Sequence, residues 1–530
     1  ALQASQDLTG AVAAYRRALA ADPQSLEAHL QLANIQLQQG DLQEAADSYR
    51  RALATRPDHF QAQLRLADVQ RRLGKLDEAA SHCRAALALD PGAVEGHYHL
   101  GLILQEQGDL AGAEASLHHA LQIAPESAGT WNNLGLVLQQ AERRDEAEDA
   151  YRRALSLDAN QPEAHRNLAN RLRETGRYAE AGKLLDHAVE LDPRAAEPHW
   201  DRALLWLLQG DFEHGWPEYE WRWQGEGVPR RDFGLPPWQG ANLADLGILV
   251  YAEQGVGDEI MFASCLPDLM ERARHVVLDC DPRLAPLFRR SFPAATVHGG
   301  PQDAAPDWLR DAPAVDVQIA VGSLPLYLRR RREDFPCRGS YLAAAQQAVR
   351  KWRQRYEDLG AGLKIGISWR GGRGSQKTQR STRLEQWRDL LSLAGTHWIN
   401  VQYGDCHEEL AHAQTQLGVE IHHWEDADPL RDLDDFAAQI AALDLVISID
   451  NSTVHLAGAL GVEVWTLQPH APDWRWLAAG SDCHWYPSLR HFRQPRAGDW
   501  GAVFQQAVAV LRERLQAAEG PAPNHRTGDD

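Results

Sequence analysis

Cysteine is scarce in this sequence, and its six cysteines include no Cys-X-X-Cys pair. Neither a disulfide framework nor a zinc knuckle is therefore indicated, and we expect a protein of the reducing cytoplasm. Long apolar runs are missing as well: none approaches the roughly 20 residues that cross a bilayer, and no signal-peptide pattern is present. We accordingly expect no transmembrane segment.

Basic residues are outnumbered by acidic ones. The formal net charge of −20 leaves no general basic face for a phosphate backbone, so a nucleic-acid partner is not expected. A content of 44% hydrophobic and 24% charged residues is typical of a globular protein. The 530 residues suffice for about two to four domains.

Proline, glycine and alanine recur every 34 residues in the first half of the chain. The prolines stop a helix, the glycines end the preceding helix, and the alanines let the two helices approach closely. The series are Pro23, Pro57, Pro91, Pro125 and Pro193, with Ala159 on the remaining beat; Gly40, Gly74, Gly108, Gly176 and Gly210, with Glu142 on the missing beat; and Ala11, Ala45, Ala79, Ala113, Ala147 and Ala181. This pattern is that of the tetratricopeptide repeat (TPR), a helical pair of 34 residues. Residues 1–229 are therefore predicted to form an α-helical solenoid.

The period also frames the individual repeats. Full repeats are predicted at 26–59, 60–93, 94–127, 128–161 and 162–195. A degenerate sixth repeat, 196–229, is rich in aromatic residues and contains Pro217, which favours a cap that docks onto the next domain. Residues 1–25 hold only the second helix of an earlier repeat. We therefore expect the natural chain to extend upstream, or this sequence to be a fragment.

Solenoids of this kind present a concave groove, commonly to an extended peptide. Asn133 and Asn167 occupy the same position in successive repeats, and side-chain amides in such a column can hydrogen-bond a peptide backbone. Alternatively, both side chains are solvated or make local helix contacts. A protein or peptide acceptor bound in the groove is the expected partner.

Beyond residue 230, apolar segments alternate with helical ones, as in parallel sheets with crossover helices. The predicted strands of a first domain, 230–345, are 247–253, 275–280, 294–298 and 315–321. Those of a second domain, 363–519, are 364–369, 398–402, 419–423, 444–450 and 462–467. An amphipathic helix at about 341–359 places a linker helix at 346–362, a last helix covers roughly 500–518, and 520–530 is expected to be a disordered tail. The predicted fold is α/β, with two Rossmann-like domains facing a cleft.

The segment 444–461 combines a buried strand with a helix that follows it directly. Asn451, Ser452 and Thr453 are cap-type residues at the start of that helix, and a free helix N-terminus at the carboxyl end of a strand suits a phosphate. Asp450 is placed to accept hydrogen bonds from sugar or ribose hydroxyls. His455 would contact a phosphate or fill the interface between sheet and helix. The alternative for the whole segment is an ordinary capped helix.

A second loop, 253–262, follows the first predicted strand. Gly255 and Gly257 permit a tight turn and close approach of a ligand, and Asp258 stands at the mouth of the following helix. No third glycine is placed as in the dinucleotide fingerprint, so a nicotinamide cofactor is not expected. The alternative for Asp258 is that it serves only as a helix cap.

A third loop, 369–383, holds five cations and no acid in a chain that is otherwise acidic. Guanidinium and ammonium groups there suit a diphosphate leaving group, although a solvated basic loop is the alternative. The cations are Arg370, Arg373, Lys377, Arg380 and Arg383. Further along, the aromatic segments 471–476 and 485–487 would stack on a nucleobase or belong to the core.

The second half resembles the heptosyltransferase-like glycosyltransferases of the GT-B fold, and the whole resembles bacterial proteins that fuse tetratricopeptide repeats to such a domain. The segments that carry the resemblance are 255–260, 365–369, 380–381, 444–461, 473–476 and 485–487, within 246–500. The architecture is also similar to that of O-linked N-acetylglucosamine transferases, which join the same repeats to a GT-B pair.

The resemblance implies an inverting, metal-independent transfer of sugar from a nucleotide sugar, without a further cofactor. Asp258 would be the general base that activates an acceptor hydroxyl, and Arg380 or Lys377 would neutralise the departing diphosphate. The donor would be bound by the segment from Asp450 to His455 together with Ser368, Arg370 and Ser381. The basic loop does not reproduce the lysine pattern of the heptosyltransferases.

We therefore expect a glycosyltransferase whose solenoid recruits a protein acceptor. The sequence leaves two alternatives open. One is a TPR scaffold whose GT-B half is degenerate and inactive. The other is a heptosyltransferase of envelope glycan, although no amphipathic basic anchor is evident in the sequence.

Overall fold

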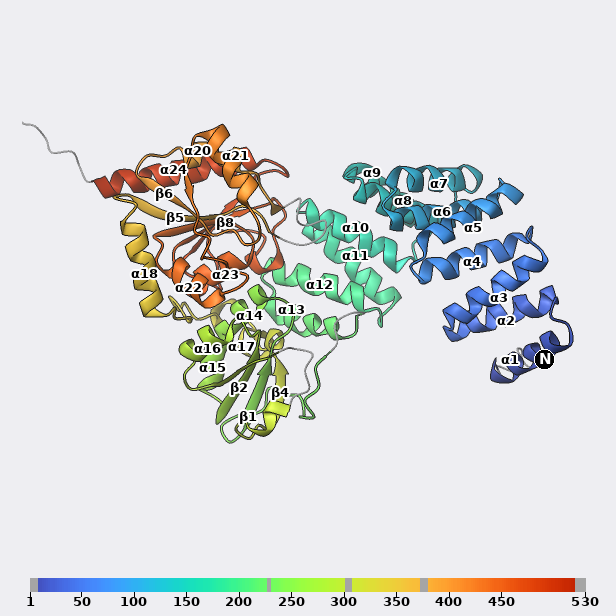
Figure 1. Cartoon of the computed structure of the whole chain (residues 1–530), viewed down its shortest axis with the longest axis horizontal. Helices are drawn as coiled ribbons and strands as arrows, with labels where there is room; N and C mark the ends of the chain where they lie inside the picture. Colours follow the sequence, from blue (N-terminus) through green and yellow to red (C-terminus); the bar gives the residue numbers. More distant parts are fainter. Residues whose placement is uncertain (1–7, 226–229, 301–306, 372–379, 520–530) are drawn as a thin grey trace, which may run out of the picture. The chain divides into compact units, whose positions relative to one another are not determined.

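A computed structural model describes residues 8–225, 230–300, 307–371 and 380–519 (Figure 1). The chain forms two compact units. The first consists of Ala1–Leu172 with Ala179–Arg194, and the second of Arg173–Tyr178 with Ala195–Asp530. The predicted tail 520–530 lies outside the described residues. Within the described part of the chain, no helix combines the length and apolarity needed to cross a membrane.

The helical pairs begin at the residues that the 34-residue period predicts. After α1 (Leu8–Ala21), the helices of the full repeats are α2 (Leu26–Gln39), α3 (Leu42–Thr55), α4 (Phe60–Arg72), α5 (Leu76–Leu89), α6 (Val94–Gln107), α7 (Leu110–Ile123), α8 (Ala128–Gln140), α9 (Arg144–Leu157), α10 (Pro162–Glu174) and α11 (Tyr178–Leu191). The sixth repeat consists of α12 (Ala196–Gln209) and α13 (Phe212–Tyr219). The alanines on the repeat beat, such as Ala45 and Ala113, are fully buried between the helices. The chain is thus a TPR-type solenoid followed by a region with parallel sheets.

The turn between the two helices of a repeat requires a left-handed residue. Gly108 adopts φ +82° there, as the glycine on this beat does in the other repeats that have one. Glu142 replaces glycine in the fourth full repeat and still adopts φ 61°. A side chain with a Cβ is strained in this region, so the repeat turn imposes its conformation on Glu142.

One contact links successive repeats and was not predicted. In each of the five full repeats, the fourth residue of the first helix uses a side-chain nitrogen to bond the backbone carbonyl six residues earlier, at the proline position of the preceding repeat. The pairs are His29 with Pro23 (3.0 Å), Gln63 with Pro57 (3.0 Å), His97 with Pro91 (2.9 Å), Trp131 with Pro125 (3.0 Å) and His165 with Ala159 (2.8 Å). Three residue types share this role because each presents an N–H at a similar reach. These histidines are therefore structural.

The first parallel sheet has the strand order β3-β2-β1-β4. Its strands are β1 (Gly247–Tyr251), β2 (His275–Cys280), β3 (Thr296–Gly299) and β4 (Val317–Ala320), all within the predicted segments or shifted by one residue. Helices α14 (Val256–Phe262), α15 (Leu266–Met270) and α16 (Ala285–Ser291) belong to its crossovers. The carboxyl ends of β1 and β2 lead directly into the loop 253–258 and into Asp281.

The second sheet is also parallel, with the order β10-β9-β8-β5-β6-β7. Its strands are β5 (Leu363–Ser368), β6 (Thr396–Asn400), β7 (Ile421–His422), β8 (Leu445–Ile449), β9 (Val464–Gln468) and β10 (Leu489–Arg493). The sequence predicts the first five of them. The edge strand β10 was missed, because its short segment carries two arginines and lacks a continuous apolar run.

Helices cover both faces of the second sheet (Figure 1). Ile365, Ile367 and Ile447 pack in one core with α24 (Trp500–Glu519), while Val446 and Val464 pack on the opposite face with α22 (Leu433–Ala441) and α23 (Ser452–Ala459). The last helix therefore packs on the second sheet. The linker helix α18 (Gln346–Glu357) is shorter at its start than the predicted 341–359.

The sixth repeat packs in the same compact unit as the sheets. Trp216 and Tyr219 of α13 contact Trp474, with ring centroids 5.7 and 5.5 Å apart, and Trp216 also contacts Phe262 at 6.4 Å. The aromatic excess that predicted a docking cap is used in this interface. The sixth repeat therefore belongs to the second compact unit, whereas most of the preceding repeats form the first.

Candidate functional site

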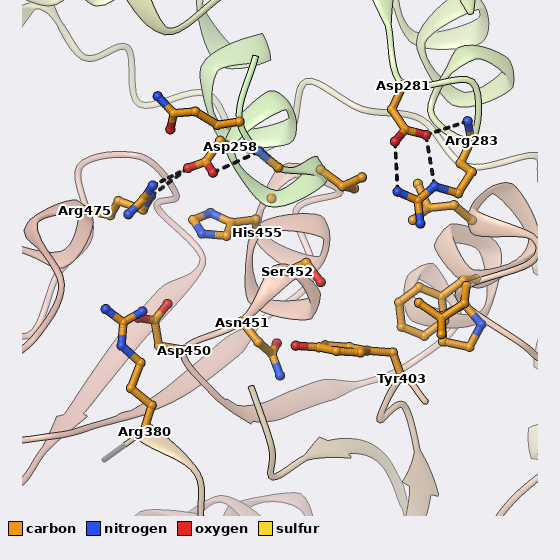
Figure 2. A pocket seen from close by; sticks show the side chains of 18 residues that line it. Asp258, Asp281, Arg283, Arg380, Tyr403, Asp450, Asn451, Ser452, His455 and Arg475 are labelled. Carbon is orange, nitrogen blue, oxygen red and sulfur yellow. Dashed lines mark hydrogen bonds and ion pairs between the residues drawn. The ribbon is translucent and has the colours of Figure 1, made fainter. Parts of the chain in front are cut away.

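A cavity of about 870 Å³ opens at the carboxyl ends of both sheets (Figure 2). Open α/β sheets hold their ligands at this edge. The first sheet contributes Gln254, Gly255, Gly257, Asp258, Asp281 and Arg283 to its lining. The second contributes Arg380, Tyr403, Asp450, Asn451, Ser452, His455 and Arg475, among others. The cavity therefore gathers eight of the residues that the sequence singled out: Asp258, Gly255, Gly257, Arg380, Asp450, Asn451, Ser452 and His455.

Asp258 occupies the first turn of α14 and serves two purposes. Its Oδ2 accepts a weak hydrogen bond from the Gly255 amide at 3.4 Å, which is the capping role considered as the alternative. Its Oδ1 accepts from Nε of Arg475 at 2.9 Å and also from Nη2 of the same guanidinium. The carboxylate thus caps its helix and faces a cation of the second sheet's side (Figure 2).

Arg475 begins a row of alternating charges along one side of the cavity. Its Nη1 donates to Oδ1 of Asp473 at 2.6 Å, and Oδ2 of Asp473 accepts from Arg380 Nη2 at 2.8 Å. Nη1 of Arg380 then donates to Asp450 Oδ2 at 2.9 Å. The row Asp258–Arg475–Asp473–Arg380–Asp450 joins the loop after β1 to the loop after β8.

Burial and charge act differently on the two inner acids. Burial raises the pKa of Asp450 above its ordinary value, and the nearby Arg380 only partly opposes this. Burial would also raise the pKa of Asp473, but Arg475 and Arg380 outweigh it and hold that pKa well below the usual range. Asp473 is therefore the firmly ionised partner of both arginines, whereas Asp450 takes up a proton more readily.

The start of α23 is tied to the end of β5 by Asn451. Its Oδ1 accepts from the Thr453 amide at 3.0 Å, and its Nδ2 donates to Ser368 Oγ at 2.7 Å and to the Arg370 carbonyl at 3.1 Å. Asn451 is thus the N-cap of α23 as well as part of the cavity wall. Ser368 and Thr453 are almost fully buried and do not line the cavity, so their predicted contact with a donor is not supported by their position.

His455 lies one turn into α23, between this helix and α14. Its Nδ1 is 2.9 Å from the Tyr486 hydroxyl, and its ring stacks on Trp476 with centroids 4.9 Å apart. Burial, helped by the Arg475 charge, lowers the pKa of His455 to about 4. A neutral imidazole therefore fills the interface, which is one of the two expectations for this residue, and it also borders the cavity.

The glycines of the 253–262 loop act differently from the prediction. Gly255 has φ −113°, which any residue adopts, and the left-handed residue of the turn is Gln254 at φ 63°. At Gly257 an added Cβ would lie 3.3 Å from His455 Cδ2 and 3.6 Å from Ser452. Gly257 therefore allows α14 and α23 to approach each other.

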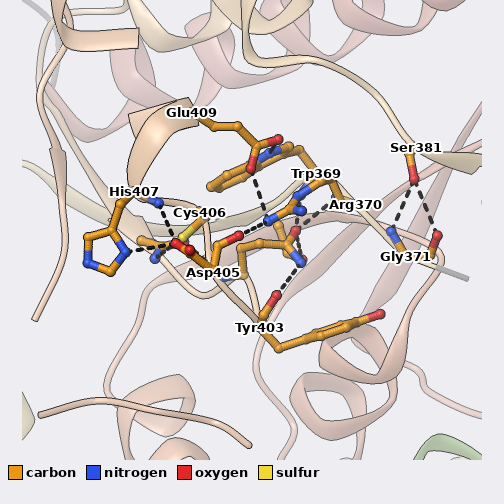
Figure 3. A network of polar contacts seen from close by, with 12 residues as sticks. Trp369, Arg370, Gly371, Ser381, Tyr403, Asp405, Cys406, His407 and Glu409 are labelled. Atoms are coloured by element: carbon orange, nitrogen blue, oxygen red, sulfur yellow. Dashed lines mark hydrogen bonds and ion pairs between the residues drawn. The ribbon is translucent and has the colours of Figure 1, made fainter. Parts of the chain in front are cut away.

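Arg380 and Arg370 of the basic loop lie in different environments, and Figure 3 shows that of Arg370. Arg380 enters the cavity, but Arg370 turns to α21 (His407–Leu417), where Nη2 lies 2.9 Å from Glu409 Oε2 and 2.7 Å from the Asp405 carbonyl. Ser381 bonds the Gly371 backbone at 3.2 and 3.3 Å and closes the base of the loop. Arg370 and Ser381 therefore lie outside the cavity lining, contrary to their predicted donor contact. Lys377 and Arg373 fall outside the described residues.

Of the two alternatives for the aromatic segments 471–476 and 485–487, a nucleobase platform or part of the core, the structure favours the core. Trp474, Trp476 and Trp485 are buried in the core and do not line the cavity. Besides the His455 imidazole, the rings that line it belong to Tyr403, which follows β6, and Phe436 of α22. Burial against the sixth repeat explains the difference for Trp474, since Trp216 and Tyr219 cover it.

Sequence reasoning missed the presence of Arg475, Asp281 and Arg283 in the cavity lining. Asp281 comes directly after β2, and its Oδ2 and Oδ1 accept from Arg283 Nη2 at 2.8 Å and Nε at 3.0 Å (Figure 2). An acid at the end of a predicted strand was an available signal for it. Arg475 carried no such signal, because it stands seven residues after β9 in a tryptophan-rich stretch.

The two asparagines proposed for the solenoid groove make contacts between repeats. Nδ2 of Asn133 donates to the Tyr98 hydroxyl at 2.8 Å, and Nδ2 of Asn167 donates to Oδ1 of Asn132 at 3.0 Å. Asn167 is buried and Asn133 half-buried. Their amides thus act in local helix contacts, the alternative that the sequence left open.

Known proteins resemble parts of the chain. A family model described as the cilia and flagella-associated protein 70 C-terminal domain matches residues 1–208. Protein FlbA of Caulobacter vibrioides is 34% identical over 326 residues, which are 59% of this chain and 54% of FlbA. The chain thus spans about half the length of that curated relative.

Solved structures of repeat proteins also resemble it. PilF of Pseudomonas aeruginosa is 25% identical, covers 38% of this chain and 90% of its own, and has a TM-score of 0.34. A thermophilic TPR protein of Thermus thermophilus is 26% identical over 34% of this chain and 100% of its own, with a TM-score of 0.31.

Proposed function

We propose that the protein is a glycosyltransferase of GT-B type that moves a sugar from a nucleotide sugar to an acceptor hydroxyl in the cavity. The observation that carries the proposal is the pairing of Asp258, from the first sheet, with the arginine-rich wall of the second. A base on one wall and cations on the other are what a displacement at an anomeric carbon requires.

The step balances as a single in-line displacement. Asp258 accepts the proton of the acceptor hydroxyl through Oδ2, while Oδ1 stays hydrogen-bonded to Arg475. The acceptor oxygen forms a bond to the anomeric carbon as the bond from that carbon to the phosphate oxygen breaks. The diphosphate leaves with the electron pair, and inversion at the carbon follows from attack opposite the leaving group.

The second sheet's side supplies the charge that the leaving diphosphate needs. The side chain of Arg380 is only 18% exposed on the cavity wall, so its positive charge is poorly screened. The amides at the start of α23, beside Ser452, add the positive end of a helix dipole. These groups make a metal ion unnecessary to the proposal, and Tyr403 and Phe436 offer ring surfaces to the nucleoside.

The proposed acceptor is a protein recruited by the solenoid, since TPR arrays commonly bind extended peptides. A panel of nucleoside diphosphates and nucleotide sugars, ADP-heptose included, in a thermal-shift assay tests the proposal. A ligand at about 100 times its Kd adds about 2.7 kcal/mol to the folded state. A selective shift, followed by mass-spectrometric detection of sugar transfer, supports the transferase. No shift with folded protein favours a non-catalytic TPR scaffold, and a shift with ADP-heptose alone favours an envelope heptosyltransferase.

A further inference from the structure

A buried arginine of the sixth repeat contacts the start of the segment 253–262, which carries Asp258. Arg222 lies in the short helix η1 (Glu220–Trp223) that follows α13. Its Nε and Nη2 donate to the two carboxylate oxygens of Glu253 at 3.0 and 2.7 Å. Arg222 is 5% exposed and Glu253 7% exposed, so the pair is shielded from water and held strongly in one geometry.

Further hydrogen bonds hold both members of this ion pair. Arg222 Nη2 donates to Ser323 Oγ at 2.7 Å and Nη1 to the Tyr219 carbonyl at 3.1 Å. Oε1 of Glu253 additionally accepts from the Gly322 amide at 3.0 Å. The end of β1 is therefore fixed between the sixth repeat and the loop after β4.

A second polar contact reaches the next residue of the loop. Nε2 of Gln254 donates to the Tyr219 hydroxyl at 2.9 Å. Gln254 holds φ 63°, an unfavourable conformation for a residue with a Cβ that persists where the surroundings enforce it. Tyr219 is 1% exposed, and the contact orients the residue four positions before Asp258.

The same repeat also holds the opposite wall. The carbonyl of Leu208 in α12 accepts from the Ala478 amide at 2.7 Å. Trp474 packs on Trp216 and Tyr219, and Leu477 adopts φ 58° between these two anchors. Arg475 lies inside this held segment.

We propose that the sixth repeat is a working part of the site, in which Arg222 and Tyr219 are positioning residues that keep Asp258 in register with Arg475. The inference rests on the proposed function for the claim that this register serves catalysis. A cap that only shielded apolar surface would need the tryptophan contacts alone. Directed hydrogen bonds, buried at Glu253 and part-buried at Gln254, instead fix the geometry of one loop.

Hydrogen exchange on the full chain tests the inference, with Tyr219→Phe as the mild variant and Arg222→Lys as the stronger one. The matched control is Tyr49→Phe, which removes an equally buried hydroxyl that donates to Asn34 at 2.6 Å inside the solenoid. We expect amides of 253–262 to exchange about fivefold faster in Tyr219→Phe, since one hydrogen bond is lost, and faster still in Arg222→Lys. Tyr49→Phe should leave this segment unchanged.

The same variants separate the inference from the proposed function. If the wild type transfers sugar, Tyr219→Phe should lower kcat with little change in the KM for the nucleotide sugar, and Tyr49→Phe should change neither. If loop exchange in both sixth-repeat variants matches Tyr49→Phe, the inference is overturned even when the wild type is active. If the exchange changes but the wild type neither binds a nucleoside diphosphate nor transfers sugar, the proposed function fails and the catalytic part of the inference fails with it.

Discussion

Asp258 and Arg475 stand 217 residues apart in the sequence, yet Arg475 Nε lies 2.9 Å from Asp258 Oδ1 in the cavity. Asp258 lies in α14, which follows β1 of the first sheet, and Arg475 lies in the segment that follows β9 of the second. Oδ2 of Asp258 accepts from the Gly255 amide at the start of its own helix, and Oδ1 accepts from Arg475 on the opposite wall. A carboxylate held in this way has little freedom to rotate, which suits a base that must meet one hydroxyl.

Replacement of Asp258 by asparagine tests the base directly. Asp258→Asn keeps the size of the side chain but cannot accept the proton, so we expect transfer to fall by about 10²–10⁴-fold. Binding of the nucleoside diphosphate, measured by calorimetry, should be nearly unchanged. The control is Asp281→Asn, which alters the other first-sheet carboxylate of the cavity and should retain most activity. An active Asp258→Asn variant would remove Asp258 from the role of base.

Arg380 and Arg370 provide a matched pair for the diphosphate. Arg380→Lys keeps one charge but loses the planar fork that spans Asp450 and Asp473, so nucleoside diphosphate affinity should fall by about tenfold or more. Arg370→Lys changes the same residue type in the same loop, but its guanidinium is bound to Glu409 outside the cavity. Calorimetric titration of both variants should show weakening in the first alone. Equal affinities would place the diphosphate elsewhere.

The helical half was predictable almost to the residue because proline and glycine recur at the helix ends of most repeats, and the 34-residue period locates the fourth full repeat, which lacks both. Strand positions were predictable from apolar runs, and β10 was missed for want of one. Asp258, Arg380 and Asp450 were found because loops at the carboxyl ends of parallel strands converge. Arg475 was not, since only the folded chain brings it to Asp258.

Side-chain direction set the other limit on prediction. Ser368 ends a strand but donates to Gln402, and Arg370 pairs with Glu409 outside the cavity. The tryptophans near Arg475 were equally compatible with stacking or burial. The choice depended on Trp216 and Tyr219, which arrive from a repeat more than 250 residues earlier.

Glu259 predicts a pH dependence of stability. Burial raises the pKa of Glu259 from 4.5 to about 8. The charges of Asp281, Asp279 and Asp258 add to this rise, and the hydrogen bond from the Asp281 amide opposes it. Below pH 4.5 the Glu259 carboxyl is protonated in both the folded and the unfolded chain, so its contribution to the free energy of unfolding is at its full value. As pH rises from 4.5 to 8 the unfolded chain ionises first, and stability falls by up to about 1.4 kcal/mol per pH unit.

Glu259→Gln should abolish this loss, because the amide oxygen can still accept from the Asp281 amide but carries no proton to release. Thermal unfolding of the variant and the wild type at about pH 5 and about pH 8 measures it, with the variant gaining relative stability at the higher pH. Exposed Glu271, on the same domain, supplies the control Glu271→Gln, which should show no such trend. A constant difference between Glu259→Gln and the wild type across this range would contradict the assignment.

Glu142 predicts a stabilising substitution in the solenoid. It holds φ 61° at the position where Gly108 and the other repeat glycines sit, so Glu142→Gly should relieve roughly 1 kcal/mol of backbone strain. The variant loses an ion pair with Arg144, but both side chains are partly exposed and such pairs contribute little. After the added chain entropy of glycine, a net gain of roughly 0.5 kcal/mol remains.

Native-state hydrogen exchange of α8 and α9 in the full chain should show slower opening, whereas Gly108→Glu should speed the opening of α6 and α7. Faster exchange in Glu142→Gly would mean that the side chain of Glu142 contributes more than its backbone costs.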